Sequence, residues 1–426
     1  MKKYVIIGYV FGIGGWQTYM NNKLLLMQEN GWEPYALSNG ILFDDKNYLP
    51  GLEKYQPNRF FEFSMFPYPS DLPTRRLEEL RARVSRIIDY HEGDEIIFET
   101  TKLEMFLWAE YLAQAFGGRS ICVEVSNRFA RYGRPMLDFF YFKEQRTELL
   151  MMLKTGLHEL FEGYREYPRV IDDNVGALTE SEYADDGKDY RSLLNVDQSD
   201  YVIGTVGWLD KGYYSVLMDE VVRFAQANKD KKVQFIVVGK SSTGAVEQQY
   251  RAKAAQADNL RLDILGPIAP VPSNLVSLFD VSVASYGCAT ITDKIGVKTI
   301  AMHDPDPIPL GILSYTITKG PFNTRVNQDK TICDMLTDIL VNRICDRMVY
   351  TPYKSRGVED QKKLHLKKLN DMPEKIEYYD ISGLHNPGAD LKYRVWLLIY
   401  RFLGSRATDE ILRKRAENRV KTRQGE

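Results

Sequence analysis

The segment that decides the fold is Tyr4–Trp16, with the sequence Tyr-Val-Ile-Ile-Gly-Tyr-Val-Phe-Gly-Ile-Gly-Gly-Trp. It opens with Tyr4–Ile7, a short apolar run typical of a parallel strand that is buried on both faces. Glycines follow, and Gln17–Asn30 then predicts a helix. A strand, a glycine-bearing loop and a helix aim backbone N–H groups at a bound phosphate. We therefore expect a phosphate or nucleotide close to the cluster of Gly12, Gly14 and Gly15. The alternative is that these glycines only permit a tight turn.

A dinucleotide-binding domain is the first alternative to consider for this opening. That fold requires an acidic residue at the end of the second strand, roughly 20 residues beyond the glycines, to bind the ribose. The second predicted strand, Glu33–Leu37, is followed by Ser38-Asn39-Gly40 and has no carboxylate at its tip. We therefore do not expect NAD as a cofactor.

Length and composition predict a globular protein of two domains. The chain has 426 residues, which is long for one hydrophobic core, and 44% of them are hydrophobic. The formal net charge of -2 gives no reason to expect nucleic acid as a partner. No apolar run reaches the ~18 residues needed to span a bilayer. We expect a soluble, cytoplasmic protein that is at most peripheral to a membrane.

The cysteines and histidines do not suggest a metal site. Four cysteines are present without a Cys-x-x-Cys pair, and five histidines without a His-x-x-x-His pair. This pattern favours reduced thiols over a disulfide framework or a zinc site. We predict no catalytic metal.

Strands and helices alternate along both halves of the chain, which predicts two doubly wound α/β domains with a boundary near residue 190 and a ligand-binding cleft between them. In the first half we expect further strands at Phe60–Phe66, Glu95–Glu99 and Arg119–Val125, and helices at Leu72–Tyr90, Leu103–Phe116 and Phe139–Phe161. In the second half we expect strands at Tyr201–Val206, Val233–Val238, Leu260–Leu265, Val281–Ala284 and Lys298–Met302, helices at Ser215–Asn228, Val246–Ala257 and Ser273–Leu278, and a loop at Tyr286–Thr292.

Two strand ends in the first half carry carboxylates. Glu99 and Glu124 each close a predicted strand, and ligands of parallel sheets bind beyond the carboxyl ends of the strands. Both are therefore candidates for the catalytic, acceptor-side part of a site. The alternative is that they cap neighbouring helices or pair with Arg128, Arg131 or Arg134.

The order of these elements resembles the GT-B glycosyltransferases, specifically the nucleotide-sugar-dependent group 1 family, which is retaining and has two facing Rossmann-like domains. Three stretches carry the resemblance: Phe11–Trp16 with the helix and Asn30–Pro34 after it; Val206–Gly212, Val-Gly-Trp-Leu-Asp-Lys-Gly; and the run from Leu265-Gly266-Pro267 through Leu278–Ser285 to Ile295-Gly296-Val297. Together they span roughly residues 4–302.

The resemblance implies roles for particular residues. Gly14 and Gly15 would approach the donor phosphates, and Gly207 would lie in the second glycine loop. Lys211 matches the lysine that neutralises the departing nucleoside diphosphate, a role that a fixed cation can perform because negative charge develops on the leaving oxygens. The alternative for Lys211 is a solvated lysine in a surface turn.

The sequence also departs from the family pattern. Trp208 occupies the position of the family's paired arginine, and the second of the family's two glutamates would fall at Ile291. Asp293 is the nearest carboxylate to that position and is the candidate for binding the donor ribose. Lys240 or Lys298 could supply the missing positive charge.

The implied function is transfer of a sugar from a nucleoside diphosphate sugar, used as co-substrate without an obligatory metal, to a glycan or lipid-linked saccharide acceptor. The family suggests bacterial surface polysaccharide biosynthesis. A non-catalytic GT-B partner subunit that binds glycan or glycosylated protein is one alternative, and a nucleotide-sugar epimerase of similar fold is another.

The predicted division is an acceptor-side domain at 1–190, a donor domain at 191–385 and a C-terminal helix in 386–426. Leu391–Gly404 is amphipathic and rich in aromatic residues, and a basic tail, Arg413–Arg423, follows it. This helix is expected to cross back and pack on the first domain. The alternative is that its basic and aromatic residues contact an anionic membrane surface.

Overall fold

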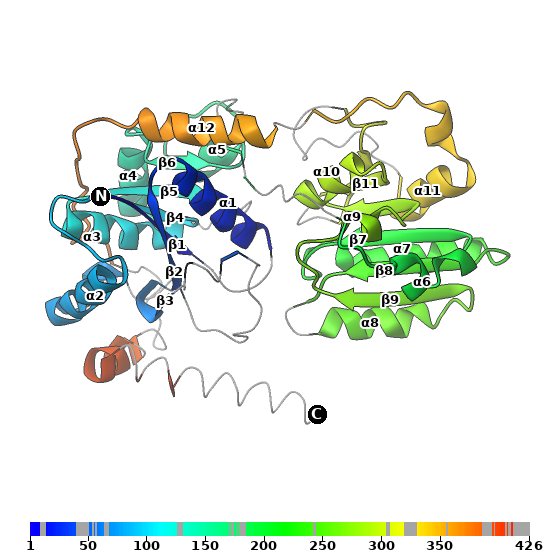
Figure 1. Ribbon diagram of the computed structural model, residues 1–426, viewed down its shortest axis with the longest axis horizontal. Helices are drawn as coiled ribbons and strands as arrows, with labels where there is room; N and C mark the ends of the chain where they lie inside the picture. The colour runs from blue at the N-terminus through cyan, green and yellow to red at the C-terminus, as the bar shows by residue number, and fades with distance from the viewer. Residues whose placement is uncertain are drawn as a thin grey trace. The chain divides into compact units, whose positions relative to one another are not determined.

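The chain forms two compact units, each built around one sheet (Figure 1). The first unit comprises Met1–Thr179 and Gly357–Glu426, and the second comprises Glu180–Arg356. The computed structural model describes residues 1–8, 14–39, 51–52, 55, 58–63, 68–125, 131–169, 171, 174–176, 178, 185–241, 244–303, 307–318, 330–354, 357–385, 394–395, 397–404, 407 and 410–411. The predicted α/β class with two parallel-sheet, Rossmann-like domains is confirmed.

The first unit contains a parallel sheet with the strand order β3-β2-β1-β4-β5-β6. Its central strand β1 is packed on both faces, because Val5 and Ile7 enter one hydrophobic cluster and Tyr4 and Ile6 enter another. The strands are β1 Lys2–Gly8, β2 Glu33–Asn39, β3 Asn58–Phe60, β4 Glu95–Thr100, β5 Arg119–Glu124 and β6 Leu149–Met151. The helices are α1 Gly15–Glu29, α2 Thr74–Ile87, α3 Phe106–Phe116, α4 Arg134–Glu144, α5 Gly156–Leu160 and α12 Val358–Asn370.

The second unit repeats this design with the order β9-β8-β7-β10-β11-β12. Its final strand, β12, pairs antiparallel with β11, and the other neighbouring strands are parallel. The strands are β7 Tyr201–Val206, β8 Val233–Val238, β9 Leu260–Gly266, β10 Val281–Ala284, β11 Lys298–Met302 and β12 Pro309–Ile312. The helices are α6 Tyr190–Leu193, α7 Tyr214–Ala227, α8 Ala245–Ala254, α9 Ser273–Val276, α10 Tyr286–Lys294 and α11 Ile332–Leu336.

Three secondary-structure predictions were wrong. The helix predicted over Phe139–Phe161 is interrupted by β6, since Thr147 adopts a left-handed φ of 58° that ends α4 and turns the chain into the sheet. The strand predicted from Phe60 ends there and continues as a 3-10 turn, Phe61–Phe63. The loop predicted over Tyr286–Thr292 is α10, whose Ala289 and Ile291 are buried.

The chain returns to the first unit at residue 357, earlier than the predicted C-terminal helix. In α12, orange in Figure 1, Leu364, Leu366 and Leu369 pack against the cluster that holds β1 and α1. Residues 357–385, which the sequence placed in the donor domain, therefore belong to the first unit, and the second unit begins at Glu180.

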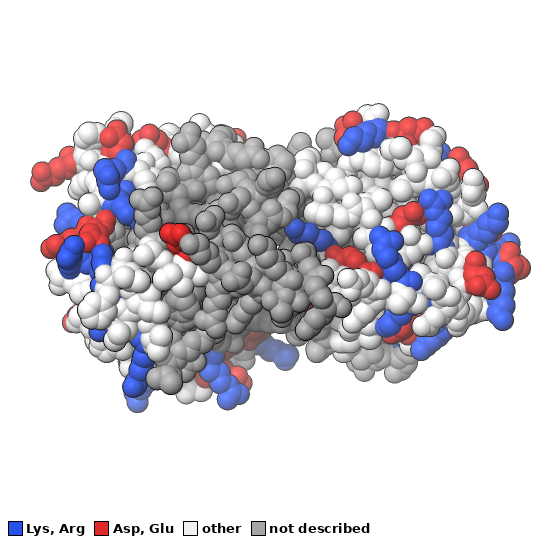
Figure 2. Space-filling view, turned by 90° about the horizontal axis from the view of Figure 1, so that it is seen from below, with Lys and Arg blue, Asp and Glu red and all other residues white. Residues whose placement is uncertain are grey.

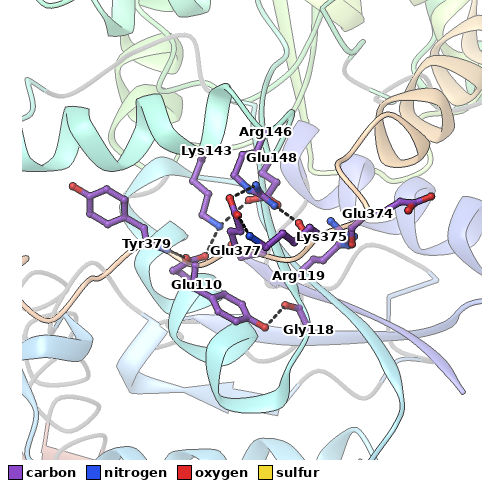
Figure 3. Close-up of polar contacts among 12 residues, drawn as sticks. Glu110, Gly118, Arg119, Lys143, Arg146, Glu148, Glu374, Lys375, Glu377 and Tyr379 are labelled. Atoms are coloured by element: carbon purple, nitrogen blue, oxygen red, sulfur yellow. Dashed lines mark hydrogen bonds and ion pairs between the residues drawn. The ribbon is translucent and has the colours of Figure 1, made fainter.

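A buried group of charges fixes the segment after α12 to the first unit (Figure 3). The Lys143 ammonium lies 2.5 Å from a Glu110 carboxylate oxygen and 2.8 Å from one of Glu148. Glu110 also accepts the backbone N–H of Tyr379 at 2.7 Å, and Arg146 donates to the carbonyl of Lys375 at 2.6 Å. We call this set, with Glu377 paired to Arg146, the Lys143 cluster.

Charges of both signs are interspersed over the described part of the face in Figure 2. That region shows no broad area of one sign, and the prediction that nucleic acid is not a partner stays a prediction. No described helix combines the length and the apolar character that crossing a bilayer requires.

Candidate functional site

The strand orders locate one candidate site in each unit. In an open parallel sheet, ligands bind beyond the carboxyl ends of the strands at the point where the strand order reverses. That point lies between β7 and β10 in the second unit and between β1 and β4 in the first. The residues that follow these four strands are therefore the first to examine.

In the second unit, the reversal point brings Lys211 and Ser285 together. Lys211 lies in the turn after β7, and Ser285 lies between β10 and α10. The Lys211 Nζ donates to the Ser285 hydroxyl at 2.8 Å, and Ser285 is fully buried. The predicted lysine is thus held by a specific contact at the edge of the sheet, which does not fit the alternative of a solvated lysine in a surface turn.

The N-terminus of α10 adds a second positive group at this position. Ser285 is the N-cap residue, but its side chain makes no capping hydrogen bond, and the first turn of α10 contains no acidic residue. The orphan N–H groups of a helix N-terminus carry about half of a positive charge. Because this partial charge and the Lys211 ammonium converge on Ser285, an anion bound there would offset both.

Two glycines let the strand ends approach closely beside Lys211. Gly207 has a φ of 149° and Gly239 a φ of 153°. A Cβ on Gly239 would lie 1.9 Å from the carbonyl oxygen of Gly207, which no side chain can tolerate. Two backbone hydrogen bonds join these segments. The N–H of Gly207 donates to the carbonyl of Val238 at 2.9 Å, and the N–H of Leu209 donates to the carbonyl of Lys240 at 3.0 Å. Gly207, which we predicted to lie in the second glycine loop, therefore adopts a φ that favours glycine whether or not a phosphate binds there.

Three aromatic or thiol side chains complete the surroundings of Lys211. Tyr286 has a left-handed φ of 50°, uncommon for a bulky residue, and its ring centroid is 6.0 Å from the Lys211 Nζ. The Tyr213 hydroxyl is buried without a hydrogen-bond partner among the described atoms, and burial raises the Tyr213 pKa well above its ordinary value. Cys288 is the one half-buried cysteine of the four, all of which are described.

Trp208 and Lys240 flank this position. The Trp208 side chain is 36% exposed, whereas the next residue, Leu209, is buried. Lys240 follows β8, and its neighbour Ser241 donates from its backbone N–H to Glu247 at 2.6 Å. The backbone of Lys240 thus lies at the same edge of the sheet as that of Lys211. Its predicted contact with phosphate stays a prediction.

Asp293 lies near the end of α10, about two turns from Ser285. It is 5% exposed and accepts a 2.5 Å hydrogen bond from the Ser314 hydroxyl, and burial raises the pKa of its carboxyl above the ordinary value. Ser314 in turn accepts the backbone N–H of Tyr353 at 2.8 Å. These contacts tie Asp293 to the chain that follows β12. Ribose binding by this residue stays a prediction.

In the first unit, the reversal point is formed by Gly8, Thr101 and the start of α1. A Cβ on Gly8 would lie 2.9 Å from the Thr101 hydroxyl, which is buried and has no hydrogen-bond partner among the described atoms. Gly14 is the N-cap of α1 and Gly15 its first residue; the first turn has no acidic residue and no side-chain cap. The loop between β1 and α1, residues 9–13, lies outside the described residues. Phosphate contact at Gly14 and Gly15 stays a prediction.

Glu99 is inside a buried polar network rather than at the open edge. It is fully buried and accepts hydrogen bonds from the hydroxyls of Tyr4 and, at 2.8 Å, Tyr19. The Lys23 Nζ lies 3.6 Å from Glu99 and 3.2 Å from the Nδ1 of His365 on α12. Burial, followed by the nearby Lys23 charge, lowers the His365 pKa well below its ordinary value. These contacts join β1, α1, β4 and α12.

Glu124 caps a neighbouring element, the alternative that the sequence left open. It is 2% exposed, and it accepts the backbone N–H of Leu103 at 2.7 Å at the start of the turn that leads into α3. Arg128 lies outside the described residues. The contacts of Glu99 and Glu124 do not test catalysis, and their catalytic roles stay predictions.

The sequence interpretation missed Ser285, Tyr213 and the N-terminus of α10. One signal for the helix was available: Ser285 precedes Tyr286–Lys294, and serine is a favoured N-cap residue. No sequence signal pairs Ser285 with Lys211, 74 residues away. Among the described residues, no group of His, Cys, Asp and Glu is arranged to hold a metal ion. The absence of an obligatory metal stays a prediction.

Solved structures show the same fold. Anabaena Alr3699/HepE in complex with UDP and glucose has a TM-score of 0.59 and 12% identity, covering 87% of this chain and 100% of that one. A glycosyltransferase from Rickettsia africae ESF-5 has a TM-score of 0.53 and 13% identity over 87% and 94% of the two chains. A putative UDP-N-acetylglucosamine 2-epimerase from Listeria monocytogenes has a TM-score of 0.50 and 12% identity over 86% and 95%.

No protein-family model matches the sequence, and none of the curated protein sequences matches it. At identities of 12–13%, the structural similarity shows the fold alone, which is that of GT-B proteins. Function therefore has to be argued from the site.

Proposed function

We propose that this protein is a glycosyltransferase that takes a sugar from a nucleoside diphosphate sugar, with the donor diphosphate bound at Lys211 and the N-terminus of α10. The observation that carries the proposal is the 2.8 Å contact between Lys211 and Ser285 at the reversal point of the second sheet. Two positive groups converge there on one buried hydroxyl. A diphosphate has the charge and the acceptor oxygens that such a position favours.

The chemistry follows from where charge develops in the reaction. The bond between the anomeric carbon and the diphosphate oxygen breaks, an acceptor hydroxyl oxygen bonds to that carbon, and the proton of that hydroxyl passes to the departing diphosphate. Negative charge accumulates on the departing diphosphate, where the Lys211 ammonium and the N–H groups of Tyr286, Gly287 and Cys288 would stabilise it. We propose that Asp293 binds the donor ribose and that Lys240, Gly14 and Gly15 contact the donor phosphates. We propose Glu99 and Glu124 as residues of the acceptor side.

Uridine is the first nucleotide to test. Anabaena Alr3699/HepE is described both in complex with UDP and glucose and in complex with UDP-glucose. The resemblance to the group 1 family extends the proposal to retention of the anomeric configuration and to a glycan or lipid-linked saccharide acceptor in bacterial surface polysaccharide biosynthesis. A cytoplasmic location at the inner face of the membrane follows from such an acceptor.

Two specific observations support alternative functions. The epimerase among the similar structures supports a nucleotide-sugar epimerase. Trp208, in place of a phosphate-binding arginine, supports a non-catalytic partner subunit that keeps the fold without turnover.

Product analysis with UDP-glucose and UDP-N-acetylglucosamine separates these functions. A transferase releases UDP and adds the sugar to an oligosaccharide acceptor, whereas an epimerase converts the donor into its 2-epimer without needing an acceptor. Lys211→Ala should abolish the reaction, while Lys231→Ala, which removes a lysine near the amino end of β8, should leave it unchanged. Donor binding without any turnover would contradict the transferase and support the partner subunit.

A further inference from the structure

The C-terminal helix carries an exposed apolar face that the donor site does not explain. Residues 394–395 and 397–404 are helical, and they lie at the lower left of the first unit in Figure 1. Val395 is 50% exposed, Leu398 57%, Phe402 77% and Leu403 56%. Large exposed apolar patches on folded proteins mark sites of interaction with proteins, membranes or ligands.

Helical geometry places these side chains on one side. Successive residues of a helix are rotated by about 100°, so Val395, Leu398 and Phe402, spaced by three and four residues, share a face, and Leu403 adjoins it. Tyr400 lies on the opposite face and is 2% exposed. The helix is thus apolar both where it packs on the protein and where it meets solvent.

Hydrogen bonds prevent the exposed face from turning inward. The Tyr400 hydroxyl donates to the buried Glu62 carboxylate at 2.6 Å. The Arg76 guanidinium donates to the carbonyl oxygens of Arg401 at 3.1 Å and Phe402 at 3.3 Å, in the last turn of the helix. Arg401 donates to the Asp71 carbonyl at 2.7 Å. These contacts hold the helix on the first unit with Phe402 outward.

Two exposed arginines lie on this helix. Arg394 and Arg401 are exposed, and the described residues 394–395 and 397–404 include no carboxylate, while Glu410, further along the chain, is exposed. The sequence continues into Arg413–Arg423, which contains six basic residues and one acidic residue.

We propose that this helix docks on the surface of an anionic lipid bilayer. An interfacial helix buries its apolar side chains at the boundary between headgroups and acyl chains, and its basic residues attract anionic lipids. A second copy of the chain fits less well, because a two-fold interface through Val395, Leu398 and Phe402 would bring Arg394 and Arg401 of one copy close to the same arginines of the other. The inference depends on the C-terminal helix alone and not on the donor-site proposal.

Vesicle co-sedimentation of the full chain tests the proposal. Wild type should sediment with phosphatidylcholine vesicles that contain phosphatidylglycerol, and less with pure phosphatidylcholine or at high salt. The double variant Leu398→Glu/Phe402→Glu should lower the partition coefficient by about tenfold or more for each side chain replaced. Arg394→Glu should weaken binding to the anionic vesicles only.

Val349→Glu is the matched control, because Val349 is 81% exposed and lies in the second unit. It should bind vesicles as wild type does. All variants replace exposed side chains, and unchanged circular dichroism and melting temperature show that they are folded. The proposal is overturned if wild type does not bind the anionic vesicles, if the double variant binds equally well, or if the face instead drives dimerisation in light scattering without lipid.

Discussion

Removing Lys143 should destabilise the first unit strongly, because its ammonium pairs with two buried carboxylates. The side chains of Lys143, Glu110 and Glu148 are 1%, 0% and 2% exposed. In Lys143→Met the methylene stem is largely retained, while Glu110 loses its 2.5 Å ion pair and Glu148 keeps only the Arg146 guanidinium, at 3.3 Å. Breaking a buried ion pair in this way costs about 3–5 kcal/mol, a large part of the roughly 5–15 kcal/mol that stabilises a typical domain.

Urea unfolding measures this loss, with Arg75→Met as the control. Arg75 pairs with Glu79 at 3.1 Å, but its side chain is 83% exposed, so its loss should cost about 0–1 kcal/mol. Since Glu110 also holds the backbone of Tyr379, limited proteolysis of Lys143→Met should cut near that residue faster than in wild type. Equal stability of Lys143→Met and wild type would refute the conclusion that the Lys143 cluster holds the segment after α12 on the first unit.

Three further predictions concern pH, the donor site and the glycine contact. Because the His365 pKa is lowered in the folded state, the unfolded state binds more protons below about pH 6.5. The unfolding free energy should therefore fall by up to roughly 1.4 kcal/mol per pH unit on acidification. Urea unfolding at several pH values measures this slope, which should be smaller in His365→Gln. An unchanged slope would contradict a buried neutral His365. Trp208→Arg should tighten UDP binding about tenfold, because it adds a charge-assisted hydrogen bond beside Lys211; weaker binding in calorimetry would count against that geometry. Gly239→Ala should cost more than about 1 kcal/mol in urea unfolding, since its Cβ would lie 1.9 Å from the Gly207 carbonyl oxygen, whereas Gly383→Ala, with no atom within 4 Å of the new Cβ, should be nearly neutral.

The fold could be predicted because its central strands are short and predominantly apolar. In β8, Val233–Val238, every residue is buried, and short runs of this kind separated by amphipathic helices indicate a doubly wound sheet. The elements that were missed depend on tertiary packing. The helix α10 contains Thr290, Ile291 and Thr292, which are poor helix formers, yet it is stabilised by the buried Ala289 and Ile291.

The candidate site could be predicted only in part, because its contacts join residues that are distant in sequence. Lys211 was found from its loop, but its partner Ser285 is 74 residues away. Glu99 looked like an open strand-end carboxylate, yet Tyr4, 95 residues earlier, and Lys23 enclose it. Which face of the sheet α12 would cover could not be read from its own sequence.

Calorimetric titration of UDP into wild type, Lys211→Ala and Lys231→Ala tests the donor-site proposal most directly. Loss of a hydrogen bond from a charged group costs about 1.5–3 kcal/mol, or roughly tenfold to a hundredfold in affinity. We expect UDP to bind wild type and Lys231→Ala, and to bind Lys211→Ala with this weaker affinity. Equal affinity of all three, or no binding of UDP to folded wild type, would contradict the claim that Lys211 and the start of α10 bind a nucleoside diphosphate.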